Sequence, residues 1–337
     1  MLNSYWVGML NAAMQPIPHL VFAFACGTLA ACAPSAELSS SSEGVGPQDS
    51  GPQNSGTQEP VVQASAVPAA ESADGLIFIP AGQLLAGAGD ERRPSLTGIA
   101  VDVAAFRIEA HEVTNDRFAE FVSATSHVTD AERIGDSVVF TPGQGWSIVR
   151  GADWQHPLGP GDSIESRGTH PVVHVSFADA QAFAAWAGLR LPTETEWEWA
   201  ARGGLVAAPY AWGDDLRPGG VFQANCWQGV FPELNRLEDG FASTAPVGTF
   251  PANGYGLHDV SGNVWEWVST QRGEGPVASL HEPRSVLTEP GLDFQIRGGS
   301  FLCAENYCQG YRPSERQFKL ERDASNNVGF RCAADAR

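Results

Sequence analysis

The alternation of apolar runs and turn residues marks where the folded part of the chain begins. Leu76–Pro80 is a short apolar run that stops at Pro-Ala-Gly, which predicts an opening β-strand. Ile108–Val113 predicts another strand, which leads into Thr114. We therefore expect regular structure from about Gly75 onward.

Three segments combine a capping residue with apolar positions at helical spacing. Thr114 can cap a helix whose apolar face is Phe118, Phe121 and Val122. The other two helices begin with a capping box, in which a hydroxyl residue and an acidic residue three positions later satisfy each other's backbone N–H. In one box Ser176 pairs with Asp179, and the helix is expected to end at Gly188. In the other Thr193 pairs with Glu196, and the helix is expected to end at Gly203-Gly204.

The remaining segments carry weaker signals. Residues 123–169 show no strong period and are expected to form long surface loops. Beyond Pro209 turns dominate, as in Asn253–Gly256 and Ser261–Asn263. Helices in the first half and glycine-bent loops with short strands in the second predict an α+β fold rather than alternating βαβ units.

Residues 1–32 have the pattern of an export signal. Leu20–Ala31 is an apolar stretch of about twelve residues, too short to span a bilayer as a helix. It ends in Leu-Ala-Ala-Cys, a lipobox in which Cys32 would be lipidated and become the mature N-terminus. No Lys or Arg precedes Arg92, so the usual positive region is missing. A plain cleaved signal and an apolar membrane anchor are the alternatives, and all three place the rest of the chain outside the cytoplasm.

Residues 33–74 are rich in Ser, Pro, Gly, Gln and Ala and carry almost no large apolar side chain. Such a segment cannot bury enough surface to offset its ordering entropy, so we expect a flexible linker. The chain then divides into a lipoprotein signal peptide (1–32), this linker (33–74) and one folded domain (75–337). Attachment to a membrane is expected only through the lipid on Cys32.

Composition excludes some partners. The 337 residues are 43% hydrophobic and only 18% charged, as in a globular protein, and 39 acidic against 20 basic residues give a net charge of -19. Such a surface repels phosphate backbones, so nucleic acid is not an expected partner. The 10 Trp and 37 Gly residues indicate a loop-rich core in which indoles fill space and glycines turn corners.

Two cysteines five residues apart form the candidate reactive site of the chain. Cys303 and Cys308 follow Gly298-Gly299, whose freedom from a Cβ allows tight backbone geometry. Two thiolates on one short segment can bind a single soft metal ion such as Cu(I), whereas the same spacing also suits a short-loop disulfide. Spacing alone leaves both possibilities open.

The chain resembles the sulfatase-modifying factor family across residues 77–334. The matching blocks are His170–Ser176 (HPVVHVS), Leu189–Trp199 (LRLPTETEWEW), Asn253–Leu257 (NGYGL), Gly262–Trp267 (GNVWEW), Arg297–Ser300 (RGGS) and Asn327–Arg331 (NVGFR). The resemblance implies the loop-rich, C-type-lectin-like α+β fold of that family. Formylglycine-generating enzymes, iron-dependent sulfoxide synthases and non-catalytic relatives all share these blocks.

The cysteine pair resembles the mark of the formylglycine-generating branch. The resemblance implies that Cys303 and Cys308 bind Cu(I), and that the protein uses O2 to convert the Cys of a sulfatase-type Cys-x-Pro-x-Arg segment to Cα-formylglycine. It also implies that Ser300 and Tyr307 line the oxygen and substrate pocket and that Trp265 forms an indole wall. Taken singly, a buried Tyr or Trp is usually a core residue.

Some positions depart from the family pattern. Ala304 stands where many relatives carry His, so any proton-handling role of that His is absent. Pro313 and Ala201 stand where secreted relatives have disulfide cysteines, which removes both bridges. Cys332 thereby loses its expected partner, and its pairing with Cys226 is left open.

Two structural calcium sites are also implied by the resemblance. The spacing of the first lets two carboxylates and two backbone carbonyls surround one hard cation, although a solvated acidic turn has the same sequence. In the second, the middle members would contribute main-chain oxygens. The two sets are Asp259, Gly262, Val264 and Glu266, and Asn225, Cys226, Asp239 and Phe241.

Two alternative functions are considered beside the formylglycine-generating enzyme. The first is a non-catalytic, calcium-braced lectin-like binding module in which Cys303 and Cys308 form a disulfide; Ala304 and the missing bridges favour it. The second is an iron-dependent sulfoxide synthase, whose branch of the family normally adds an N-terminal helical domain with His ligands. Residues 33–73 contain no His, which argues against it.

Overall fold

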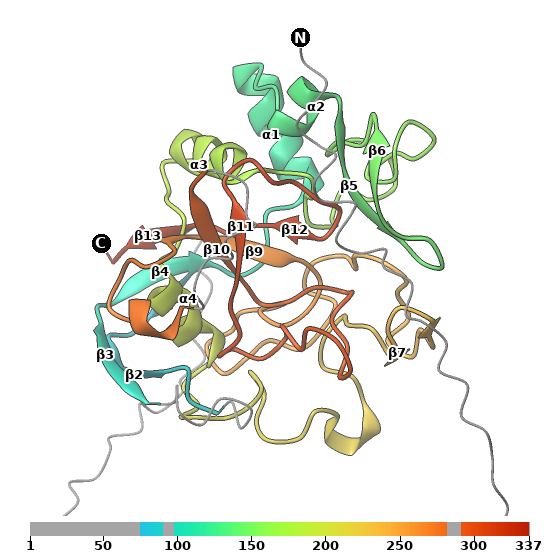
Figure 1. The fold of residues 1–337 in the computed structure, drawn as a ribbon. Coiled ribbons are helices and arrows are strands. Elements are labelled where there is room, and N and C mark those ends of the chain that lie inside the picture. The colour runs from blue at the N-terminus through green and yellow to red at the C-terminus, as the bar shows by residue number, and fades with distance from the viewer. Residues whose placement is uncertain (1–74, 90–97, 282–290, 337) are drawn as a thin grey trace, which may run out of the picture. The chain divides into compact units, whose positions relative to one another are not determined.

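The computed structural model describes residues 75–89, 98–281 and 291–336 (Figure 1). The expected signal peptide, Cys32 and the linker lie outside the described residues. Within the described part of the chain, no helix has both the length and the apolar character needed to cross a membrane.

The three helices expected from their caps are all present. Thr114 caps α1, and its hydroxyl accepts from the N–H of Arg117 at 3.3 Å. The expected capping boxes begin α3 and α4. Thr129 and Glu132 form a further box at a short helix. The α-helices of the described residues are α1 (Asn115–Thr125), α2 (Asp130–Ile134), α3 (Phe177–Trp186) and α4 (Glu194–Ala201).

In the described part of the chain, short strands form two small sheets and three hairpins. One sheet has the order β1-β4-β13, so that β1 and β13 flank β4. The other has the order β11-β10-β9-β12 (Figure 1). Their strands are β1 (Leu76–Ile79), β4 (Phe106–Glu109), β9 (Trp265–Gln271), β10 (Asp293–Arg297), β11 (Gln317–Leu320), β12 (Val328–Gly329) and β13 (Ala333–Asp335). The hairpins are β2 (Gly82–Ala86) with β3 (Ile99–Val103), β5 (Asp136–Thr141) with β6 (Gly145–Arg150), and β7 (Gly229–Val230) with β8 (Leu234–Asn235).

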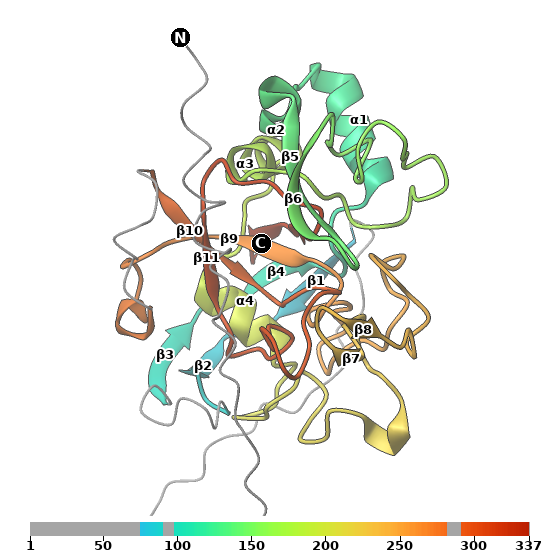
Figure 2. The ribbon, with the colours of Figure 1, turned by 45° about the vertical axis from the view of Figure 1, so that its right-hand side comes forward.

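Two expectations need correction. Residues 123–169 are not only loops, because they contain α2 and the β5–β6 hairpin, which lies beside α1 and α2 (Figure 2). Outward-facing Trp146 and Ile148 on β6 hide the alternation that a half-buried strand normally shows. The strand expected at Ile108–Val113 begins and ends earlier, at Phe106–Glu109. The α+β, loop-rich class itself is confirmed.

An aromatic cluster fills the core next to α1 and α3. Phe118, Phe121 and Phe183 are buried, and their rings meet at centroid distances of 5.3 to 6.0 Å. Phe330, which follows β12, packs edge-on against Phe183 at 5.2 Å. Two helices near the middle of the chain are thereby attached to its C-terminal segment.

Arg331 ties the C-terminal segment to the rest of the domain. A guanidinium carries five N–H donors, and the fully buried Arg331 makes five hydrogen bonds. Nε and Nη2 donate to the two carboxylate oxygens of Glu266, each at 2.7 Å. The backbone oxygens of Glu109, Ala110 and His258 accept the remaining bonds at 2.8 to 3.2 Å.

A second buried group of charges joins α4 to the C-terminal half. The carboxylate of Glu198 accepts from Arg202 at 2.6 Å, Arg297 at 2.8 Å and Arg316 at 3.1 Å. Burial would raise the pKa of Glu198, but the three guanidinium groups outweigh it and hold the pKa at about 2. This group therefore stays ionised at ordinary pH and stabilises the domain down to strongly acidic pH.

Replacing Arg331 with Met should lower the free energy of unfolding by about 3–5 kcal/mol, because Glu266 would remain buried without its counter-charge. Urea unfolding followed by tryptophan fluorescence measures the loss. Arg133→Met is the matched control, since its side chain is 53% exposed beside Asp130 and such surface pairs contribute about 1 kcal/mol or less. Equal losses in the two variants would contradict a central role for Arg331.

Candidate functional site

The cysteine pair lies on a loop whose two ends are held together by glycines. Gly299 has a φ of +75°, and a Cβ there would lie 2.5 Å from the carbonyl carbon of Gly310. A Cβ on Gly310 would in turn collide with the indole of Trp265. The close approach of Gly299 and Gly310 forms the base of the loop 300–309, and this explains why the sequence has glycine at both places.

Neighbouring segments fix the loop in place. The carbonyl of Cys303 accepts from the N–H of Trp227 at 3.0 Å, and Phe301 donates to the carbonyl of Asn263 at 2.9 Å. Further along, the side chain of Asn306 exchanges two hydrogen bonds with the backbone of Phe231, at 3.0 and 3.1 Å. The loop is therefore a supported part of the fold.

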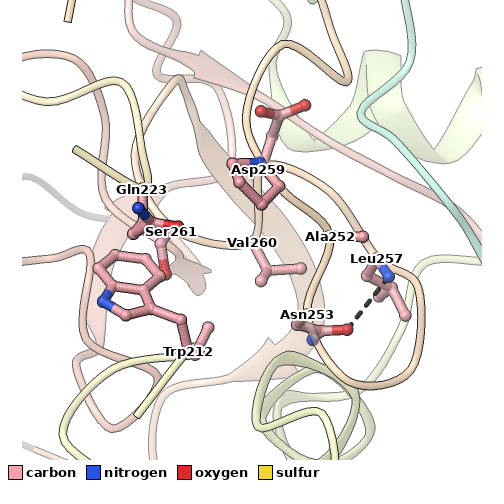
Figure 3. Close-up of a pocket in the computed structure, with 10 residues that line it drawn as sticks. Trp212, Gln223, Ala252, Asn253, Leu257, Asp259, Val260 and Ser261 are labelled. Atoms are coloured by element: carbon pink, nitrogen blue, oxygen red, sulfur yellow. Dashed lines mark hydrogen bonds between the residues drawn. The ribbon is translucent and has the colours of Figure 1, made fainter. Parts of the chain in front are cut away.

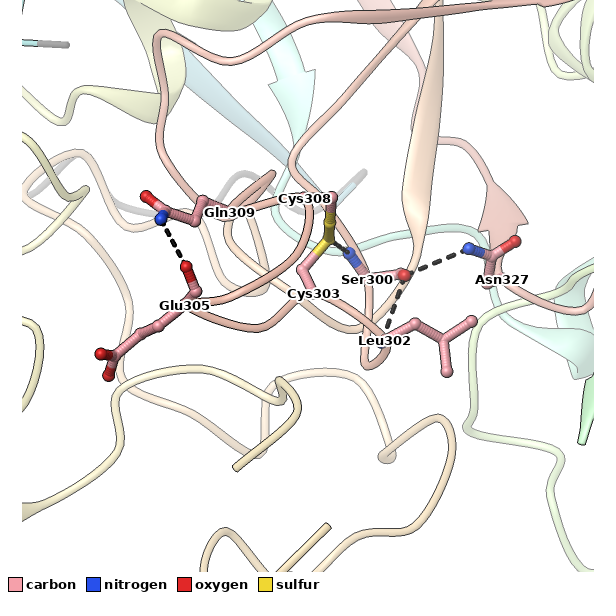
Figure 4. Close-up of a disulfide and its surroundings, with 7 residues drawn as sticks. All are labelled: Ser300, Leu302, Cys303, Glu305, Cys308, Gln309 and Asn327. Carbon is pink, nitrogen blue, oxygen red and sulfur yellow. Dashed lines mark hydrogen bonds between the residues drawn. A yellow bond between two sulfur atoms is a disulfide. The ribbon is translucent and has the colours of Figure 1, made fainter. Parts of the chain in front are cut away.

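Cys303 and Cys308 form a disulfide in this structure, with 5.2 Å between their Cα atoms (Figure 4). Cys303 is fully buried, and its sulfur accepts from the N–H of Ser300 at 3.4 Å. The hydroxyl oxygen of Ser300 accepts from Leu302 N–H at 3.3 Å and from Asn327 Nδ2 at 3.2 Å. Both lone pairs of Ser300 Oγ are thus used, which leaves its O–H to act as a donor.

One cavity of about 110 Å³ brings most of the expected site residues together. Ser300, Tyr307, Cys308 and Trp265 all line it, and the buried Cys303 lies directly behind Cys308. Trp265 is a buried wall, whereas the ring of Tyr307 is half exposed and stacks on Phe231 at a centroid distance of 4.2 Å. The structure therefore places Ser300, Tyr307 and Trp265 around the cysteine pair, as expected.

Sequence reasoning missed other residues of this cavity. Asn327 stands out in the sequence only as part of the motif Asn327–Arg331, Trp146 lies in a segment expected to be loop, and Lys319 on β11 has no local signal. Lys319 is nevertheless the only lysine among the 337 residues. A count of residue types could therefore have drawn attention to it.

The first expected calcium set contains two buried carboxylates, Asp259 and Glu266. Asp259 accepts from Gly248 N–H at 2.7 Å, and its side chain points away from Asn253 and Trp212 (Figure 3). Both oxygens of Glu266 accept from Arg331, and one also accepts from Trp197 Nε1 at 2.7 Å. Glu266 therefore already has a counter-charge in this structure.

Glu112 is an acidic neighbour of this set that the sequence did not single out. Its carboxylate accepts from Asn263 Nδ2 at 2.6 Å and from Val264 N–H at 3.1 Å. Burial, followed by the charges of Asp259 and Glu266, raises the pKa of Glu112 well above its usual range. Burial likewise raises the pKa of Asp259. The charge of Arg331 lowers the pKa of Glu112 and Asp259 but does not offset their burial.

The second expected calcium set contains a buried side-chain oxygen that accepts no hydrogen bond. Oδ1 of Asn225 is buried and has no hydrogen-bond partner in the structure, while its Nδ2 donates to Ser243 O at 2.8 Å. Asp239 accepts from the N–H groups of Cys226 and Phe241 at 3.1 and 3.0 Å. Across the described residues, no three His, Cys, Asp or Glu side chains converge as a metal site. Both calcium sites stay predictions.

Cys226 and Cys332 are free thiols, not partners of each other. Burial, with a smaller contribution from Asp239, raises the pKa of Cys226 to about 12. Burial and the charge of Glu109 raise the pKa of Cys332 well above its usual value. Both thiols are consequently in the unreactive neutral form at physiological pH.

Two solved structures share the fold of this chain at low sequence identity. The structure of PvdO from Pseudomonas aeruginosa aligns with a TM-score of 0.56 at 24% identity, covering 83% of this chain and 100% of that one. The crystal structure of CarF aligns with a TM-score of 0.50 at 22% identity, covering 78% and 98%. These likenesses concern the fold alone.

Sequence comparison defines the family. The sulfatase-modifying factor enzyme 1-like domain matches residues 62–336. Over 306 residues the chain is 45% identical to a formylglycine-generating enzyme of Streptomyces coelicolor, covering 82% of this chain and 95% of that relative. It is 46% identical over 267 residues to the Mycobacterium tuberculosis enzyme of that name, covering 70% and 89%. It is also 38% identical over 282 residues to the mouse inactive Cα-formylglycine-generating enzyme 2, covering 77% and 86%. The chain belongs to the sulfatase-modifying factor family, as its motifs predicted.

After mild reduction of the folded protein, iodoacetamide at pH 8 should label Cys308 first, because only that sulfur of the pair lies at the cavity. Cys226 and Cys332 should stay unlabelled until the protein is unfolded, since burial keeps them neutral. Peptide mapping by mass spectrometry measures the order. Labelling of Cys332 before Cys308 would contradict this arrangement.

Proposed function

We propose that this chain is a formylglycine-generating enzyme, which converts a cysteine of a sulfatase-type polypeptide to Cα-formylglycine with O2 as co-substrate. The observation that carries the proposal is the cavity in which Cys308, Ser300, Tyr307 and Trp265 meet. Identities of 45% and 46% to relatives named for this activity support an enzyme rather than a fold analogue.

The donor set at this cavity fits a soft metal ion. Once reduced, Cys303 and Cys308 supply two thiolates from one supported loop, the ligands that Cu(I) prefers. Bound Cu(I) would supply the one-electron and O2 chemistry that protein side chains lack. The two cysteines would hold the ion, and the opening at Cys308 leaves room for the sulfur of a target cysteine.

Other residues of the cavity orient what enters it. The free O–H of Ser300 can donate to an electron-rich sulfur or oxygen, because its acceptor positions are filled by Leu302 and Asn327. Trp265 closes one side of the cavity with an apolar surface that excludes water. The half-exposed Tyr307 lies where an extended polypeptide would enter.

A second candidate is the non-catalytic binding module. The Cys303–Cys308 disulfide in this structure favours it, and one relative of 38% identity is named an inactive enzyme. The two functions differ in what reduction does. A catalytic pair must open and accept copper, whereas a structural bridge should stay closed or cost stability when opened.

We also propose that the protein acts outside the cytoplasm, anchored by a lipid on Cys32. The lipobox at Cys32 and the Ser/Pro/Gly-rich segment 33–74 support this location. A flexible tether would let the domain reach polypeptides near the membrane surface. No nucleic acid is expected as a partner, because the net charge is -19.

Cys303→Ser and Cys308→Ser should each abolish aldehyde formation on a peptide with the Cys-x-Pro-x-Arg segment, since one thiolate cannot hold Cu(I) in the same way. Mass spectrometry of the peptide after incubation with reduced, copper-loaded protein under air measures the product. Cys226→Ser is the control and should keep the activity. Full turnover by either pair variant would sink the proposal, and no turnover by the unaltered protein would favour the binding module.

We propose in addition that two calcium ions brace the loops around the site. The buried carboxyls of Glu112 and Asp259, whose raised pKa reflects too little positive charge nearby, support the first ion, and the orphaned Oδ1 of Asn225 supports the second. Carboxylate and amide oxygens are the donors that calcium prefers. Glu112 would join Asp259 as a source of negative charge for the first ion.

Calcium should raise the unfolding midpoint at pH 7 and raise it less at pH 5. In EDTA, the raised pKa of Glu112 means that its contribution to stability is present at low pH and lost as pH rises. Calcium replaces the missing proton at pH 7 and contributes about 2–3 kcal/mol at roughly a hundredfold excess over its Kd. Glu112→Gln should reduce this gain, whereas the exposed Glu120→Gln should not. A calcium effect independent of Glu112 would contradict the assignment.

A further inference from the structure

The only lysine of the chain lies at the cysteine pair. Nineteen of the 20 basic residues are arginines, because Lys+Arg is 20 and Lys319 is the single lysine. Its side chain lines the same cavity as Cys308, Ser300 and Tyr307. β11 places it there through pairing with β10, in which Lys319 lies opposite Phe294.

The charge of this cavity is unusual for so acidic a protein. None of the described residues that line it is Asp or Glu, and Lys319 is its only cationic side chain. The other ionisable groups at its wall are Cys308 and Tyr307, which become anions when they ionise. In a chain of net charge -19, a wall with one cation and no carboxylate suits a guest that is itself negative.

The ammonium group of Lys319 has little local compensation. Its Nζ donates to the neutral hydroxyl of Ser325 at 3.4 Å. Burial lowers the pKa of Lys319, and the charge of Asp323 opposes this only in part. The charge of Lys319 also helps to lower the pKa of the buried His174 to about 4, although burial is the main cause. A partly buried cation of this kind is stabilised by any anion that enters beside it.

We propose that Lys319 is a catalytic residue of this chain, whose ammonium group stabilises the target cysteine as a thiolate next to Cys308. The inference rests on the proposed function, because the guest is the cysteine of the sulfatase-type segment. The thiolate, not the thiol, is the form that binds a soft metal ion. Among the described residues that line this cavity, Lys319 alone can supply a positive charge beside Cys308.

Covalent capture tests whether Lys319 reaches the target side chain. A sulfatase-motif peptide that already carries Cα-formylglycine is added to reduced, copper-free protein with sodium cyanoborohydride. The amine and the aldehyde form an imine and release water, and the reagent supplies the hydride that makes the bond permanent. Since Lys319 is the only lysine, peptide mapping should find the adduct there, with the N-terminal amine as the reference for non-specific labelling. Lys319→Arg should give no adduct in the cavity.

Kinetics test the role of the charge. Lys319→Met should lower kcat/KM for the cysteine peptide about a hundredfold at pH 7, as expected for losing a charge aimed at the reacting atom. Lys319→Arg, which keeps the charge, should recover most of the activity. The deficit of Lys319→Met should shrink toward about pH 9, where the free thiol ionises without help. Thermal unfolding of both variants checks that the fold is retained.

The outcomes separate this inference from the proposed function. No aldehyde from the unaltered, copper-loaded protein means that the proposed function fails. Aldehyde formation with equal kcat/KM for the unaltered protein and Lys319→Met overturns the role of Lys319 alone. Absence of capture at Lys319 while the peptide binds also overturns it, even where both variants fail to fold. Capture at Lys319, together with a low kcat/KM for Lys319→Met and a largely restored kcat/KM for Lys319→Arg, supports the role of Lys319.

Discussion

The bidentate pair of Arg331 and Glu266 is the interaction on which the domain depends. Glu266 lies on β9, and Arg331 lies between β12 and β13, so one ion pair joins both sheets. Through its other donors Arg331 also binds the backbone at Glu109, Ala110 and His258. A fold with short strands and few helices has little repetitive hydrogen bonding, and a buried guanidinium with every donor used supplies long-range order instead.

The cysteine loop depends on that order. Asn327 and Val328 pair with the start of β9, close in sequence to Arg331, and the Asn327 side chain positions the hydroxyl of Ser300. On the other side, Trp265 at the start of β9 fills the space that Gly310 leaves. The geometry of the cavity is thus set by the same strand that carries Glu266. Stability of the core and shape of the site cannot be separated in this protein.

Sequence reasoning succeeded where local rules apply. The capping boxes at Ser176 and Thr193 depend on residues three apart, and both are present. It failed for the β5–β6 hairpin, because two-stranded pairing leaves the exposed Trp146 and Ile148 without a local pattern. Resemblance located the cysteine pair and its neighbours. The places of Lys319 and Glu112 could not be predicted, because only tertiary packing brings Lys319 to the cavity of Cys308 and Glu112 near Asp259, although Lys319 stands out as the single lysine.

Arginine and lysine have different roles in this chain because their side chains differ in shape and in how readily they lose the proton. Arginine stays charged and presents a planar fork, so buried Arg202, Arg297 and Arg316 suit permanent pairing with Glu198. Lysine is a compact point charge that responds to its surroundings, and the chain has one, at the cavity that holds Cys308. An arginine there would keep the positive charge but bring a larger, rigid fork into about 110 Å³. A lysine leaves more space for a small sulfur-bearing guest, and its ammonium group holds its proton more firmly when that guest becomes negative.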